Sequence, residues 1–128
     1  MAKITRINLP WTTVYADSTT ERSLAATPWM DASKVDQVRT IVEFRERVGD
    51  LKVCIGYETA DVPNNPGSHA KIGSLLASEG VTFPTAFTDI SSATAGKQLI
   101  RFVWVTANDS SSDLNPGRVA GVVEILEK

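Results

Sequence analysis

Cys54 and His69 are the single cysteine and the single histidine of the chain, so any thiol-based or imidazole-based catalysis would have to start from them. A nucleophile needs a base within hydrogen-bond reach. Cys54 stands in the middle of the alternating run 51–59, whereas His69 follows in a loop rich in Pro, Asn and Gly. A cysteine within a strand is typically buried and inert. We therefore expect no catalytic pair, and one Cys with one His cannot complete a zinc shell.

Two further stretches resemble binding motifs. Oxygen-bearing side chains at alternating positions from Asp109 to Asn115 could surround a hard cation. However, Leu114 replaces the glycine of a calcium loop and Ala120 replaces its closing acid, so the stretch predicts a hydrogen-bonded turn. Gly96 and the Lys after it do not make a phosphate-binding loop, because the preceding glycine and the following Ser or Thr are missing. We expect no metal and no cofactor.

Carboxylates offer no clear acid–base pair, because the candidates are scattered along the chain and a glycosidase needs two acids facing one groove. They are Asp31, Asp36, Glu43, Glu58, Asp61 and Asp89. The sequence therefore predicts a protein that is not an enzyme. A small cytoplasmic enzyme is kept as an alternative, ranked third among the functions described below.

Large apolar side chains outside the alternating runs suggest a contact surface instead. Aromatic residues anchor many protein interfaces, and an indole can also stack on a sugar. Trp104 lies in the most apolar run and is expected in the core. Trp29 could be an anchor or could cover the open end of the fold. The predicted interface residues are Trp11, Tyr15, Trp29, Met30, Leu75 and Leu76.

Composition restricts the class of protein. The 128 residues suffice for one domain, 1–128, with a core of its own. Thirteen basic and fifteen acidic residues leave a net charge of −2 with the signs interspersed, so we expect no nucleic-acid partner. No apolar run approaches the roughly 20 residues of a membrane helix. The start of the chain lacks the apolar segment of a secretory signal, so we expect synthesis in a cytoplasm.

These side chains must be held by β-strands, because short β-rich runs recur between turn signals. We expect about eight strands in a single antiparallel sandwich of jelly-roll type. The run 98–107 is apolar on both faces and predicts a central strand covered on both sides. Pro84 marks 81–88 as an edge or bulged strand. The other expected strands are 3–9, 11–16, 21–26, 51–59 and 118–127.

The stretch 33–48 is ambiguous. Val35, Val38 and Ile41 have helical spacing after a possible Ser33 cap, but the many β-branched residues favour a strand. We adopt the strand, followed by a hairpin turn in which Gly49 takes a positive φ. The run 71–80 is the best remaining place for a helical turn.

A family resemblance rests on two segments: "TPWMDASKVDQVRTIVEFRERVGDLKVCIGYETAD" and "GKQLIRFVWVTAND". In their order of features, from about Thr27 to Leu126, they resemble the galactose-binding-like, or discoidin-type, jelly roll. They are similar in particular to compact versions in the virion proteins of tailed bacteriophages. The resemblance implies an accessory virion component. No loop combines the Trp, Arg and His that sugar-binding members use.

The expected function is therefore that of a structural virion protein, a capsid decoration protein that binds the assembled shell. Its partner would be the major capsid protein or another virion protein, in a homo-oligomer or a symmetric assembly. The alternatives are a carbohydrate-binding module, which would bind a glycan, and a small tail or fibre component. We expect Trp29→Ala to weaken particle binding more than a single charge reversal at Arg39, Arg45 or Arg47 does.

Overall fold

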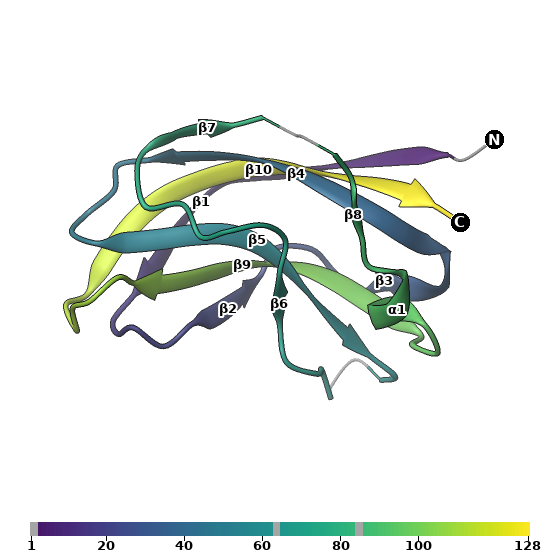
Figure 1. The fold of residues 1–128 in the computed structure, drawn as a ribbon. Helices are drawn as coiled ribbons and strands as arrows, with labels where there is room; N and C mark the ends of the chain where they lie inside the picture. Colours follow the sequence, from purple (N-terminus) through teal and green to yellow (C-terminus); the bar gives the residue numbers. More distant parts are fainter. Residues whose placement is uncertain (1–2, 63–64, 84–85) are drawn as a thin grey trace.

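The computed structural model describes residues 3–62, 65–83 and 86–128, which fold into two stacked antiparallel sheets (Figure 1). The first sheet, sheet A, has the order β1-β10-β4-β7, with β8 beside one end of β4. Its strands are β1 (Ile4–Ala16), β4 (Val35–Arg45), β7 (Gly80–Thr82), β8 (Thr88–Asp89) and β10 (Asn115–Glu127).

The second sheet, sheet B, has the order β2-β9-β5-β6, with β3 also paired to β9. Its strands are β2 (Arg22–Ala25), β3 (Met30–Asp31), β5 (Leu51–Ala60), β6 (Ala70–Lys71) and β9 (Leu99–Asn108). A 3-10 turn (Ala32–Lys34) and the short helix α1 (Ser91–Thr94) complete the described elements. No helix in these parts of the chain has the length and apolar character needed to cross a bilayer.

The strand pairing is that of a jelly roll. When the two-residue strands β3 and β8 are set aside, eight strands remain and pair from the outside of the chain inward. β1 pairs with β10, β2 with β9, β4 with β7 and β5 with β6. A long eight-stranded hairpin that rolls up on itself gives this order. The predicted all-β sandwich is confirmed, with ten strands in place of about eight.

One core lies between the sheets. Its largest fully buried side chains are Phe44 on β4 and Phe102 on β9, and Trp104 on β9 is 2% exposed, as expected of a core residue. The outward side chains of β9 are buried as well, because Val103 and Val105 pack with Cys54 under Leu75. The prediction that 98–107 is a central strand covered on both faces is confirmed.

The ambiguous stretch is a strand. β4 pairs with β10 along most of its length, and Val38, Val42 and Phe44 point into the core. Burial of alternate residues against sheet B stabilises the strand more than the helical spacing could stabilise an isolated helix. Gly49 has a φ of +61° in the turn that follows, as predicted.

Three local predictions are wrong. The run 71–80 is not helical: the Ile72 amide donates to the Ile55 carbonyl, and Leu76 bridges to Val53, so the segment follows the edge of β5. Ile72 and Leu76 reach the core from there. The runs 3–9 and 11–16 form the single strand β1, whose pairing shifts register between Leu9 and Thr12. Such a bulge accommodates Pro10, which has no N–H.

The third wrong prediction concerns the run 81–88, which is divided into β7 and β8 and does not form one strand. β7 is an edge strand of sheet A, in agreement with the edge prediction for this region. Pro84 itself, on which that prediction was based, lies outside the described residues.

Candidate protein interface

The structure distributes the six predicted interface residues over separate surfaces. Trp11 and Tyr15 both lie on β1 and are 45% and 47% exposed. The other four are half-buried: Trp29, Met30, Leu75 and Leu76. Trp11 and Tyr15 are therefore the members of the set that present most of their surface to a partner.

Trp29 is held by its own chain on the outer side of sheet B. The Arg101 guanidinium lies 4.4 Å from the centre of the indole ring. Arg101 Nε donates a 2.8 Å hydrogen bond to Glu58 Oε1, and Ser23 Oγ donates to Glu58 Oε2 at 3.4 Å. Glu58 is only 7% exposed, and its hydrogen bond holds the Arg101 side chain in place. Arg101 in turn holds the Trp29 indole against sheet B through a cation–π contact.

The three aliphatic members of the set pack inward. Met30 and Leu76 lie against the main core, and Leu75 covers the outward cluster of Cys54, Val103 and Val105. Burial raises the pKa of the Cys54 thiol to about 12, so the thiol stays protonated at neutral pH. The expectation that Cys54 is buried is confirmed. It lies on the outer face of β5, where Leu75 of the segment 72–76 packs over it.

Trp11 adjoins a hollow on the outer face of sheet A. The Arg118 guanidinium lies 5.6 Å from the centre of the Trp11 ring. Trp11, Arg45, Glu46 and Arg118 line a cavity of about 230 Å³. Arg45 also pairs with Glu43 at 3.5 Å. Sequence reasoning identified Trp11 but missed the two arginines, which lie more than 30 residues away along the chain. The alternation of inward and outward residues in β4 and β10 was the sequence signal that could have placed Arg45 and Arg118 on an outer face.

The residues around this hollow resemble a protein interface in composition. Strand alternation and register place four arginines on the outer face of sheet A, and no lysine projects from that face within its described strands. Arginine and aromatic residues are enriched at interfaces, whereas lysine is depleted. The arginines are Arg6, Arg39, Arg45 and Arg118. On the same face, Val122 of β10 pairs with Ile41 of β4, between these arginines.

The other residues considered for chemistry are held in structural contacts. His69 Nε2 lies 3.0 Å from Glu21 Oε1, and Lys71 Nζ donates to Glu21 Oε2 at 2.6 Å. These two partners hold the pKa of Glu21 below its ordinary value. In the described parts of the chain, no three His, Cys, Asp or Glu side chains gather as metal ligands would.

The stretch 108–117 contains the predicted hydrogen-bonded turn. Its donors converge on the carboxylate of Asp50, which lies in the β4–β5 turn. The Asp50 carboxylate accepts hydrogen bonds from Ser111 Oγ at 2.7 Å, from the Ser110 amide at 2.7 Å and from the Ser111 amide at 2.9 Å. These donors hold the pKa of Asp50 far below its ordinary value. Asn115 Nδ2 also donates to Asp50 and to Asn108. The oxygens of the turn thus accept hydrogen bonds from the chain's own donors.

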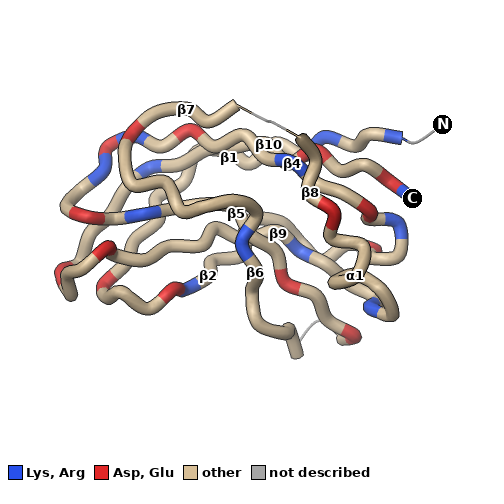
Figure 2. Tube along the Cα trace, viewed as in Figure 1, with Lys and Arg blue, Asp and Glu red and all other residues tan. Residues whose placement is uncertain are grey.

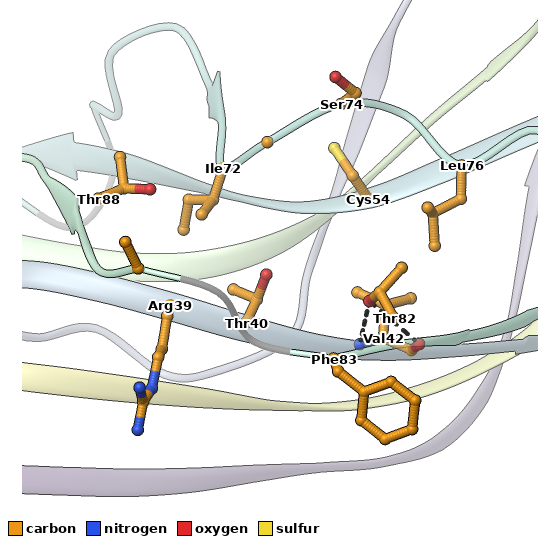
Figure 3. Close-up of a pocket in the computed structure, with 12 residues that line it drawn as sticks. Arg39, Thr40, Val42, Cys54, Ile72, Ser74, Leu76, Thr82, Phe83 and Thr88 are labelled. Carbon is orange, nitrogen blue, oxygen red and sulfur yellow. Dashed lines mark hydrogen bonds between the residues drawn. The ribbon is translucent and has the colours of Figure 1, made fainter.

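A second hollow of about 230 Å³ lies at the open edge of the sandwich, between β4 and the segment 72–76 (Figure 3). Its walls are aliphatic groups and hydroxyls, including Ile72, Leu76 and Thr40. Thr82 Oγ1 is already bonded to the Val42 backbone. The Cys54 sulfur points toward the segment that carries Ser74 (Figure 3). Among the described residues that line this hollow, Cys54 has no histidine or carboxylate beside it that could act as a base.

Comparison with known proteins relates this fold to viral capsids. No family model and no curated protein matches the sequence. Solved structures of infectious bursal disease virus do match: the Gt strain with a TM-score of 0.65 and the VP2 subviral particle with 0.61, both at 10% identity. Each match covers 98% of this chain and 33% of the other chain. The chain thus spans about a third of the length of those capsid proteins.

What is shared is the fold. At 10% identity the likeness extends to the jelly-roll sandwich and no further. The expected resemblance to virion β-sandwiches therefore holds at the level of the fold, a sandwich similar to that of viral capsid proteins. Its narrower form, a discoidin-type domain of a tailed bacteriophage, is not what these matches show.

Proposed function

We propose that this protein is a structural component of a viral particle, and more narrowly a decoration protein that binds the assembled shell of a tailed bacteriophage. The observation that supports the proposal is the jelly roll, which is similar over 98% of the chain to capsid proteins of infectious bursal disease virus. The partner in this proposal is the major capsid protein or another virion protein. The location would be the virion, after synthesis in the host cytoplasm.

The surface chemistry suggests how attachment would be achieved. Binding must offset lost translational and rotational freedom, on the order of 4–15 kcal/mol. The net charge of −2 provides little long-range attraction, so apolar contact must contribute most. Trp11 and Tyr15 are the predicted anchors that the chain leaves exposed. Since Arg101 holds Trp29 against sheet B, Trp11 replaces Trp29 as the residue to test first.

The test is co-sedimentation with emptied phage shells at low and high salt. We expect Trp11→Ala to weaken binding by at least about tenfold, as truncation of an aromatic anchor does, and salt to have a small effect. Val62→Ala is the matched control, because Val62 is 53% exposed and is not among the predicted interface residues. Failure of the unaltered protein to sediment with shells would contradict the proposal.

Carbohydrate binding is the second candidate, and one observation favours it. The fold gathers on the outer side of sheet B side chains that the sequence leaves apart, namely Trp29, Glu58 and Arg101. An aromatic ring with nearby polar groups is a common arrangement for a small ligand. Titration with soluble glycans distinguishes the two candidates: a decoration protein binds shells and leaves the glycans free. Enzymatic activity is not part of either proposal.

A further inference from the structure

Trp11, Arg45, Glu46 and Arg118 line the hollow, and Arg118 is the one of its two arginines that has no carboxylate partner among the described residues. Within the described parts of the chain, no carboxylate oxygen lies within 4 Å of its guanidinium, whereas Arg45 is paired with Glu43. Arg118 is exposed and lies over the Trp11 indole. The hollow therefore offers an aromatic wall and a free guanidinium, which suits a carboxylate with an apolar group beside it.

The same chain presents such a pair at the β9–β10 turn. Leu114 is 67% exposed, and Asp113 beside it is exposed and forms no ion pair with any described residue. The backbone beneath them is fixed, because Asn108 Nδ2 donates to the carbonyls of Ser111 and Asp113 at 3.1 and 2.8 Å. A turn that is already ordered loses little conformational entropy on binding.

The neighbouring β4–β5 turn adds an exposed apolar group beside Asp113 and Leu114. The β4–β5 turn lies beside the β9–β10 turn, since the Val48 amide donates to the Pro116 carbonyl. Acidic and basic residues lie together at this end (Figure 2). Asp109 is paired there with Lys52 at 3.3 Å, whereas Asp113 forms no ion pair with a described residue. Val48 is also 46% exposed there. The turn thus presents an unpaired carboxylate beside exposed apolar side chains, and the hollow presents an unpaired guanidinium beside an indole.

We propose that the Asp113–Leu114 turn docks in the Trp11–Arg118 hollow of a second copy of this chain. Leu114 and Arg118 are only four residues apart along the chain, about 13 Å in an extended strand. A two-fold axis therefore lets each copy dock in the other at the same time, which gives a closed isologous dimer. This inference rests on the proposed function in one respect: it supplies the contact between copies that a symmetric shell component needs.

The test measures the mass of the full chain by sedimentation over a range of concentrations. We expect a dimer with a dissociation constant on the order of 10–100 μM, as suits a small contact. Arg118→Glu and Asp113→Lys should each weaken it by at least about tenfold, because each places like charges together in both contacts. Lys97→Glu is the control: Lys97 is exposed and no described carboxylate pairs with it. It should leave the mass unchanged.

Mixing the two single variants gives the decisive result. In a heterodimer of Arg118→Glu with Asp113→Lys, both contacts regain opposite charges, so we expect the mixture to dimerise as the unaltered chain does. A mixture that stays monomeric would overturn the pairing, and so would an unaltered chain that is monomeric throughout. An equal loss with Lys97→Glu would do the same. Melting curves verify that each variant is folded, and shell binding is measured separately, so failure of the dimer and failure of the proposed function are distinguishable.

Discussion

Asp50 shows how a single half-buried acid can order a whole turn. It accepts hydrogen bonds from Ser110, Ser111 and Asn115, which lie 60 to 65 residues away along the chain. We expect Asp50→Asn to lower the melting temperature at pH 7 by several degrees, because an amide carries no charge and its NH₂ faces donors. The control is Ser112→Ala, in the same turn, whose side chain is exposed. An equal loss of stability in both variants would contradict the role given to Asp50.

Acid should reveal the same interaction. The pKa of Asp50 is lowered in the folded state by its donors, so the stabilisation is fully present above the unfolded value, about pH 4, and is lost as the pH falls toward the folded value. The gap in melting temperature between the unaltered chain and Asp50→Asn should therefore narrow from pH 5 to pH 2. Thermal unfolding followed by circular dichroism at several pH values measures it. A gap that stays constant over this range would show that protonation of Asp50 is not involved.

At the scale of elements, the β4–β5 turn depends on Gly49. Its φ is +61°, and a Cβ added there would lie 2.4 Å from Asn115 Oδ1. We expect Gly49→Ala to lower the free energy of unfolding by about 1–3 kcal/mol. Gly96→Ala is the matched control: its φ is +73°, but nothing lies within 4 Å of the added Cβ. Denaturant unfolding should give a smaller loss for Gly96→Ala, and equal losses would mean that the contact with Asn115 is unimportant.

The segment 72–76 acts as a cover for Cys54. Since Leu75 packs over this buried thiol within one chain, labelling by a thiol reagent should be slow in the free, folded protein. It should become fast in denaturant. We expect Leu75→Ala to speed labelling about tenfold or more, because it opens the cover without altering β5. Leu114→Ala, at an exposed leucine in another turn, should leave the rate unchanged. Rapid labelling of the unaltered folded chain would show that the segment does not cover the thiol.

For the whole molecule, the single core implies cooperative unfolding. Phe44 of sheet A and Trp104 of sheet B belong to one cluster, so neither sheet can keep its buried face without the other. We expect Phe44→Ala to lower the free energy of unfolding by about 3–5 kcal/mol. Transitions followed by tryptophan fluorescence and by circular dichroism should still coincide. Two separate transitions would show that the sheets unfold independently.

Much of the fold could be predicted because the period of a strand is local. Alternation in 51–59 and 118–127 placed those strands, and the apolar run 98–107 placed the central one. The prediction failed where tertiary contacts overrode the local pattern. Ile72 and Leu76 resemble a helical turn in sequence, yet they form an edge of the sandwich because β5 offers free backbone groups there. Pro10 resembles a strand end, yet a bulge carries β1 past it.

The candidate interface was predictable only in part. Residue type alone marked Trp11 and Tyr15 as possible anchors, and the structure leaves both exposed. The sequence could not show that Arg118 lies over Trp11, or that Arg101 holds Trp29. Those neighbours are separated by some 70 to 107 residues along the chain, and strand pairing alone brings them together. Hydrophobic alternation determines which residues face inward, but it carries no information about which strand lies beside which, and that order was decided by the closure of two sheets over one core.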